Sequence, residues 1–348
     1  MSVVSHPNDV TPEWLNGVFA VQGFSGRVEA VTHTMIGAGQ VGDNARFYLS
    51  GQGDLPHCVV GKFPSSDPVS RKTGAQLGNY AKEVAFYNDL APTLDVQVPR
   101  LFTTEFDPAT HDFVILMEDL APGVQVDQMS QCSVDQAAMA VEELAKLHGP
   151  RWGDETLKEH PMLVPNTEGP APGELYALMQ PGFLARYQNR MSEAEQKMVD
   201  QVGRVQTSYG AFSGVQTLIH IDYRLDNMIF GGPHPLTILD WQSYTLGCAI
   251  NDLSYFMGTS LSAERRRTHE KYLVQHYLDV LNSYGVGLSQ QACWRLYRHY
   301  APAGLIMAVI ASMIVGETER GNDMFMTMAI RSTQMCAELE TLTLLNEG

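Results

Sequence analysis

The segment from His220 to Asn227, followed by an acidic residue at Asp240, has the residue types and spacing needed to transfer a phosphoryl group to an alcohol. Such a transfer needs a carboxylate that takes the proton of the attacking hydroxyl, and here this would be Asp222. It also needs an amide oxygen and a second carboxylate that hold Mg²⁺ against nucleotide phosphates, for which Asn227 and Asp240 are suited. The alternative is an Asp- and Asn-rich surface turn between two strands. The spaced set of three residues favours the chemistry, because it is more specific than either half alone.

Composition narrows the classes of protein. The 348 residues suit one large or two smaller domains, and a net charge of −16 argues against nucleic acid as the main partner. The five cysteines are an odd number without CxxC spacing, so neither a disulfide framework nor a zinc site is indicated. The N-terminal residues lack a signal-peptide pattern, and the longest apolar run, 301–315, is too short to span a bilayer. We therefore expect a cytoplasmic protein with no membrane insertion.

The distribution of strand and helix patterns predicts an α+β fold with two lobes. Short strands are expected over residues 28–36, 46–49, 58–63, 100–106 and 113–117, with a helix over 76–90. The remainder is mainly helical, with helices expected over 134–148, 193–208, 252–261, 262–284, 289–315 and 320–345. This predicts a small β-rich lobe over residues 1–120, a hinge near 118–122 and a larger helical lobe over 123–348.

A glycine-rich turn over residues 37–43 separates the first two expected strands. Glycines in such a turn let the backbone approach a phosphate closely, but the same residues also suit an ordinary hairpin. The turn alone does not decide between these alternatives.

The order of these segments resembles the aminoglycoside phosphotransferase and choline kinase superfamily of kinase-like small-molecule phosphotransferases, and most of all its ecdysteroid-kinase-like branch. The resemblance extends over nearly the whole chain. It is carried by the segments 37–43, 59–64, 80–87, 116–120, 144–148, 220–227, 240–242 and 251–256.

This resemblance implies a two-lobed protein-kinase-like fold that uses ATP and Mg²⁺. Lys62 would contact the nucleotide phosphates and Glu83 would pair with it, whereas a surface lysine and a solvated helix face are the simpler alternatives. The residues implied in nucleotide binding are Gly37, Gly39, Gln40, Val41, Lys62, Glu83, Glu118, Asp119 and Leu120. The last three would form a hinge whose backbone groups bind the adenine edge.

The resemblance also assigns roles around the proposed base. Asp252 would brace the loop that carries Asp222, and His220 would be structural, packing under the loop and bonding its backbone. Arg224 would either neutralise the transferring phosphoryl group or pair with Asp226. The family commonly has glycine between the His and the Asp, and here Ile221 stands in that position. An isoleucine can be buried behind the loop without contacting the reacting groups.

The acceptor is expected to be a small-molecule alcohol. A protein kinase needs a long activation segment after its metal-binding Asp, but eleven residues separate Asp240 from Asp252. A catalytically inactive nucleotide-binding or scaffold protein and an aminoglycoside-type antibiotic kinase remain as alternatives. The acceptor-pocket candidates are Trp241, Gln242, Tyr255 and Phe256, next to the expected metal site. Methionines in the last third would suit an apolar alcohol, although core filling between helices is the favoured explanation.

Overall fold

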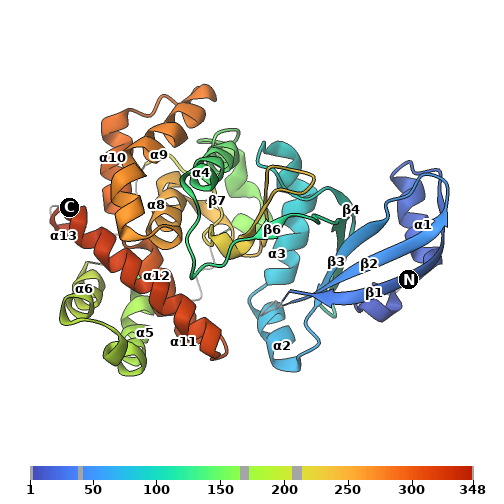
Figure 1. The fold of residues 1–348 in the computed structure, drawn as a ribbon, viewed down its shortest axis with the longest axis horizontal. Helices are drawn as coiled ribbons and strands as arrows, with labels where there is room; N and C mark the ends of the chain where they lie inside the picture. Colours follow the sequence, from blue (N-terminus) through green and yellow to red (C-terminus); the bar gives the residue numbers. More distant parts are fainter. Residues whose placement is uncertain (1–2, 38–41, 165–171, 206–213, 347–348) are drawn as a thin grey trace. The chain divides into compact units, whose positions relative to one another are not determined.

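The structure is a computed structural model that describes residues 3–37, 42–164, 172–205 and 214–346. The chain forms two compact units, which are described separately (Figure 1). The first unit contains residues 1–93, 97–123 and 231–243, and the second contains 94–96, 124–230 and 244–348. The assignment of one lobe to the nucleotide and the other to the acceptor stays a prediction.

The first unit is built on a five-stranded antiparallel sheet with the strand order β1-β2-β3-β5-β4. Its strands are β1 (Arg27–Ile36), β2 (Gly42–Gln52), β3 (Cys58–Pro64), β4 (Leu101–Asp107) and β5 (Asp112–Glu118). The five strands expected from the sequence are all present. A helix that the sequence analysis did not predict, α1 (Pro12–Val21), precedes the sheet, capped by Thr11, whose hydroxyl accepts the N–H of Trp14 at 3.2 Å.

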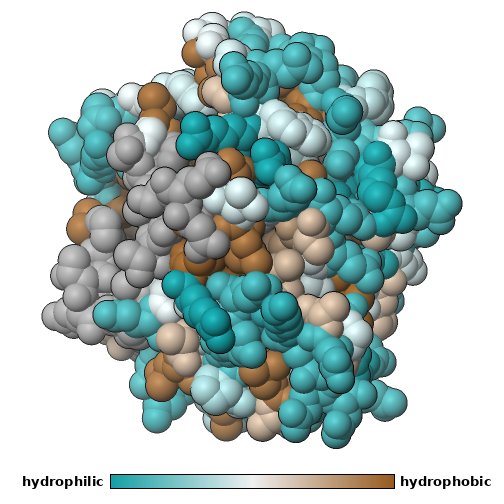
Figure 2. All heavy atoms as spheres, turned by 90° about the vertical axis from the view of Figure 1, so that its left-hand side faces the viewer, coloured by the Kyte–Doolittle hydropathy of each residue, from teal (hydrophilic) through white to brown (hydrophobic). Residues whose placement is uncertain are grey.

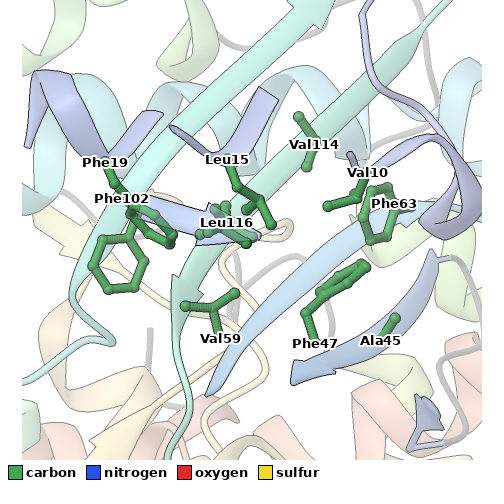
Figure 3. Packing of buried hydrophobic residues seen from close by; sticks show 11 residues of the cluster. Val10, Leu15, Phe19, Ala45, Phe47, Val59, Phe63, Phe102, Val114 and Leu116 are labelled. Atoms are coloured by element: carbon green, nitrogen blue, oxygen red, sulfur yellow. The ribbon is translucent and has the colours of Figure 1, made fainter. Parts of the chain in front are cut away.

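Helix α1 covers one face of the sheet and closes an apolar core (Figure 3). Leu15 and Phe19 of the helix are buried against side chains that alternate along the strands. Those strand residues are Ala45, Phe47, Val59, Phe63, Phe102, Val114 and Leu116. Burial of aromatic and branched side chains of this size is the main stabilisation of the unit.

The opposite face of the sheet lies against a helical segment. The helix predicted over 76–90 corresponds to α3 (Asn79–Ala85) and a π-helical turn over Phe86–Leu90, and it is preceded by α2 (Pro68–Gln76), which the sequence did not predict. The break falls at Gly78, whose φ of +71° is left-handed and favours glycine. Tyr80 of α3 stacks near Phe113 of β5, with ring centroids 4.6 Å apart. Residues of β3 that point away from the α1 core, Lys62 among them, therefore face α3.

The second unit is mainly helical, as the sequence predicted. Its helices are α4 (Val134–His148), α5 (Pro172–Tyr187), α6 (Glu193–Arg204), α8 (Ala249–Ser260), α9 (Ala263–Ser283), α10 (Gln290–His299), α11 (Ala303–Ile314), α12 (Glu319–Glu338) and α13 (Thr341–Asn346). The helix over 134–148 has the predicted bounds and cap, because Ser133 and Gln136 form a reciprocal capping box. The predicted helices over 289–315 and 320–345 are each divided in two. The first division lies just before Pro302, which cannot continue a helix.

Short strand pairs hold the loops of this unit together. Strand β6 (Val124–Gln125) pairs with β8 (Met228–Phe230), and β7 (Thr217–Ile219) pairs with β10 (Thr245–Gly247). The segment 220–227 therefore begins at the end of one strand, β7, and ends at the start of another, β8.

The face of the helical unit seen in Figure 2 is mainly hydrophilic, with apolar side chains in small groups. Within the described ranges, no helix combines the length and apolar character needed to cross a membrane.

Candidate functional site

In the first unit, the ammonium of Lys62 is held between two carboxylates. Its Nζ lies 2.6 Å from Oε2 of Glu83 and 3.1 Å from Oδ1 of Asp240. Strand alternation places Val59 and Phe63 in the α1 core and turns Lys62 toward α3, which carries Glu83. The expected Lys62–Glu83 ion pair is therefore present. Lys62 and Asp240 are 178 residues apart in the sequence and still form a hydrogen bond.

These contacts keep Lys62 charged. Burial alone would lower the pKa of Lys62, but the carboxylates of Asp240 and Glu83 outweigh it and raise that pKa above its ordinary value. A permanently charged ammonium of this kind is suited to contacts with phosphate oxygens.

A short turn after strand β9 (Leu236–Ile238) fixes Asp240. Asp240 has a φ of +66°, a left-handed conformation that is uncommon for residues other than glycine. The indole of Trp241 stacks on Phe86, with centroids 3.9 Å apart and planes 5° apart, and its Nε1 donates to the carbonyl of Ile238 at 3.2 Å. Gln242 donates to Oδ2 of Asp240 at 3.1 Å. The neighbouring residues therefore hold the carboxylate in one place despite the unfavourable backbone conformation.

The segment Glu118 to Leu120, expected as the hinge, lies at the end of β5. The carboxylate of Glu118 accepts from the backbone of Arg100 at 2.7 Å and bonds His234 Nε2 at 2.8 Å. Asp119 accepts from Arg46 at 3.0 Å. Both acidic side chains are thus engaged within the unit. Adenine binding through the backbone of this segment stays a prediction.

The glycine-rich turn is described only in part. Gly37 has a φ of +71°, as expected for a glycine that reverses the chain between β1 and β2. Gly39, Gln40 and Val41 lie outside the described residues. Phosphate binding by this turn stays a prediction.

In the second unit, Asp252 on helix α8 braces the start of the loop 220–227. Its Oδ2 accepts the backbone N–H of His220 at 2.6 Å, and its Oδ1 accepts that of Ile221 at 3.0 Å. Asp252 and His220 are both buried, and burial makes such hydrogen bonds costly to lose. The contacts are those that a loop-bracing carboxylate would make. His220 is buried with its backbone N–H engaged.

Ile221 has a φ of +73°. A β-branched residue in the left-handed region is an outlier, because its Cβ crowds the backbone. The position thus favours glycine, which agrees with the residue common in the family. The Ile221 side chain is half-buried.

The carboxylate of Asp222 accepts hydrogen bonds from three side chains. Tyr255 Oη donates to Oδ1 at 2.7 Å, and Arg224 Nε donates to Oδ1 at 2.9 Å and to Oδ2 at 3.1 Å. Asn227 Nδ2 donates to Oδ2 at 3.0 Å and to the Asp222 carbonyl at 2.8 Å. The Asp222 side chain is 21 % exposed, so the group is fixed without being sealed from solvent.

Arg224 lies between two carboxylates of its own loop. Besides Asp222, it donates from Nη1 to Oδ2 of Asp226 at 2.7 Å. Asp226 also accepts from Arg320 of α12 at 3.1 Å. The sequence is compatible with two roles for Arg224, pairing with Asp226 and contact with a phosphoryl group. The first is present, and the second stays a prediction.

Two buried residues of this site were missed. Gln128 accepts the N–H of Leu225 at 2.8 Å and donates to the carbonyl of Thr259 at 3.1 Å, joining the loop to α8. Its polar segment gave no signal for this role. His148 lies 3.4 Å from Asp252 and 2.9 Å from the hydroxyl of Tyr277. His148 is the last residue of the segment 144–148, which is one of those that carry the family resemblance. That resemblance was the feature of the sequence from which His148 could have been identified.

Three of the four acceptor-pocket candidates are buried. Trp241, Tyr255 and Phe256 are at most 1 % exposed, whereas Gln242 is half-buried. Four of the methionines noted in the last third, those at 324, 326, 328 and 335, are buried in α12, as core residues are. Contact of any of these residues with an acceptor stays a prediction.

The donor atoms suit a hard cation such as Mg²⁺. Since Asn227 directs its amide nitrogen at Asp222, its oxygen is turned away from that carboxylate and presents an acceptor. Asp240 supplies carboxylate oxygens, and amide and carboxylate oxygens are the ligands Mg²⁺ prefers. Among residues 3–37, 42–164, 172–205 and 214–346, no cluster of three His, Cys, Asp or Glu side chains forms a metal site.

Part of the chain matches a known protein family. Residues 175–285, which include the loop 220–227, Asp240 and Asp252, match the model of the ecdysteroid kinase-like family. No curated protein matches the chain.

Among solved structures, the GDP complex of wild-type aminoglycoside 2′-phosphotransferase-IIIa is similar with a TM-score of 0.56 and 13 % identity, covering 92 % of this chain and 98 % of that chain. An ethanolamine kinase of Plasmodium vivax is similar with a TM-score of 0.51 and 11 % identity, covering 87 % of this chain and 82 % of that chain. These structures confirm the predicted kinase-like α+β fold class.

Proposed function

We propose that this chain, a member of the kinase-like superfamily of small-molecule phosphotransferases whose residues 175–285 match the ecdysteroid kinase-like family, transfers the γ-phosphate of ATP to a hydroxyl group of a small molecule. The observation that carries the proposal is the contact of Lys62 with both Glu83 and Asp240. A kinase needs such an ammonium beside its metal-binding carboxylate.

In the proposed reaction, Asp222 orients the acceptor hydroxyl and takes its proton. The acceptor oxygen forms a bond to the γ-phosphorus while the bond from that phosphorus to the β–γ bridging oxygen breaks, releasing ADP. The proton of the hydroxyl goes to the Asp222 carboxylate. Arg224, which donates to that carboxylate, would stabilise the charge of the transferring group.

Asn227 and Asp240 would hold Mg²⁺, and Lys62 would contact the phosphates. When bound, Mg²⁺ neutralises phosphate charge and helps to orient the γ-phosphate. The chain's own residues prepare for this: Asp222 fixes the amide of Asn227, and the stacked Trp241 fixes the turn that carries Asp240.

The acceptor is proposed only as an alcohol, with an apolar or mixed compound preferred. The solved structures named above act on aminoglycosides and ethanolamine, but at 13 % and 11 % identity they do not specify the acceptor of this chain. An inactive scaffold of the same fold is the competing hypothesis. It would have no need of Lys62, Asp222, Asn227 and Asp240 together.

The test is a screen of the purified protein with ATP and Mg²⁺ against a library of hydroxyl compounds, read by ADP release. Asp222→Asn should keep ATP binding and lower transfer by about 10²–10⁴-fold, the usual effect of a positioned general base. Asp240→Asn should remove Mg²⁺-dependent turnover. Asp135→Asn, an exposed acid on α4, is the matched control and should behave like the wild type. ATP binding without turnover on any alcohol would favour the scaffold hypothesis.

A further inference from the structure

A second hydroxyl already occupies the proposed base. The phenol of Tyr255 donates to Oδ1 of Asp222 at 2.7 Å, which is the bond that an acceptor alcohol must make before transfer. We propose that Tyr255 is a positioning residue that takes the place of the acceptor hydroxyl on Asp222 until the acceptor binds, and thereby suppresses transfer of phosphate to water. This inference rests on the proposed kinase function and concerns the regulation of the same site.

The hydrogen bonds of Asp222 leave little room for another donor. A carboxylate has about four lone-pair positions. In this structure Oδ1 accepts from Tyr255 and Arg224, and Oδ2 accepts from Arg224 and Asn227. An incoming hydroxyl must therefore displace one of these donors or share its position.

Tyr255 is the donor that an acceptor replaces with least disturbance. Asn227 is tied a second time to the Asp222 carbonyl, and Arg224 a second time to Asp226. Both of these donors are part of the loop itself, whereas Tyr255 comes from helix α8. An acceptor alcohol also offers the same group as Tyr255, a hydroxyl that donates one hydrogen bond.

The environment of Tyr255 keeps its hydroxyl protonated and in place. Its side chain is 1 % exposed, and it is on the same helix as Asp252, which fixes the backbone of the loop. Burial, together with the negative charge of Asp222, raises the pKa of Tyr255 well above its ordinary value. The phenol therefore remains a donor at neutral pH.

The consequence is control over an unwanted reaction. Without an acceptor, a water molecule hydrogen-bonded to Asp222 would attack the γ-phosphorus and give its proton to the carboxylate, while the bond to the β–γ bridging oxygen breaks and releases ADP. With Tyr255 on Oδ1, water has no strong acceptor at the position from which it would attack. An acceptor that binds with its remaining atoms elsewhere can displace the phenol, whereas water cannot.

The test is Tyr255→Phe, which removes the hydroxyl and keeps the ring. ATP hydrolysis without acceptor, measured with Mg²⁺ and ATP alone, should rise about 10- to 160-fold, the factor that corresponds to one hydrogen bond to a charged group. The KM for an acceptor found in the screen should fall, because its competitor is gone. Tyr176→Phe is the control, since its buried hydroxyl donates to Val199 of α6, away from the loop. It should leave hydrolysis and KM unchanged.

Two further variants keep the test decisive. Adding Asp222→Asn to Tyr255→Phe should abolish the extra hydrolysis, because the gain depends on the carboxylate. If Tyr255→Phe does not fold, as judged by thermal unfolding, Tyr255→Met also lacks the hydroxyl and should give the same rise. The inference is overturned if ATP hydrolysis by a folded variant equals that of the wild type or is lower, and the KM is unchanged. Transfer by the wild type would in that case still support the proposed function. Absence of turnover with any alcohol overturns both.

Discussion

Oδ2 of Asp252 accepts the backbone N–H of His220 at 2.6 Å, so a buried carboxylate on α8 determines where the loop of Asp222 begins. The same group accepts the N–H of Ile221 from its other oxygen. A carboxylate that accepts two backbone hydrogen bonds in a buried position cannot be replaced without leaving a polar group unpaired.

Asp252→Asn should therefore lower the free energy of unfolding by about 1–3 kcal/mol, because an amide presents N–H to one of the two backbone donors. Transfer should fall as well, through displacement of Asp222. Thermal unfolding and turnover of the same preparation measure both effects. Asp279→Asn, a matched change on the exposed side of α9, should leave both unchanged. A stable variant with full activity would show that the loop holds its shape without the brace.

The left-handed backbone of Ile221 predicts an unusual order of stability. At ordinary positions alanine is more stable than glycine by about 0.4–1 kcal/mol, since glycine has more freedom in the unfolded chain. At a φ of +73° the Cβ of alanine costs about 1–2 kcal/mol. Ile221→Gly should therefore be more stable than Ile221→Ala. Ile219, in strand β7, is the control position, where the alanine variant should be the more stable one. Denaturant unfolding of the four variants gives the comparison.

Local patterns predicted much of the fold because neighbouring residues determine it. The five strands and the helix Val134–His148 with its Ser133 cap follow from alternation, helical spacing and capping residues. Helix α2 was missed because its residues are mostly polar, and the break at Gly78 was missed because a single glycine is tolerated in many helices. Helix α1 was missed although its Thr11-Pro12 start is a recognised N-terminal pattern.

Long-range contacts explain what the sequence did not predict about the site. Tyr255 was expected in the acceptor pocket, but nothing local indicates that its hydroxyl lies on Asp222, which is 33 residues away. Gln128 is 97 residues from Leu225, whose N–H it accepts. Such contacts depend on how the helices pack, and residue type and spacing do not specify that packing.

Removal of the Lys62 side chain should affect stability and nucleotide binding separately. Lys62→Met leaves the buried carboxylate of Glu83 without its cation, and breaking a buried pair in this way costs about 3–5 kcal/mol. Adding Glu83→Gln removes that charge and should recover part of the stability. ATP affinity should be low in both variants, because the ammonium is absent from both.

Thermal unfolding and ATP titration distinguish these effects. Lys72→Met, at an exposed position of α2, is the control and should match the wild type in both measurements. If the double variant regained ATP binding along with stability, Lys62 would be a structural residue rather than a ligand of the phosphates.

The stability of the protein should fall as the pH decreases below about 6.5, and His148 should account for part of that fall. The ring is fully buried between Tyr277 and Asp252. Burial lowers the pKa of His148 from its ordinary value of 6.5, and His220 lowers it further, while Asp252 opposes this only in part. Between pH 6.5 and the lowered pKa, the unfolded chain binds a proton that the folded chain does not, so acid favours unfolding. The loss is about 1.4 kcal/mol for each unit of pKa lowering and is complete below the folded-state pKa.

His148→Gln removes this titration. The variant should be less stable at pH 7.5, yet its melting temperature should change less between pH 7.5 and 5.5 than that of the wild type. His57→Gln, at an exposed position, should keep the wild-type pH difference. Equal pH differences in the wild type and His148→Gln would show that the pKa of His148 is the same in the folded and unfolded chain.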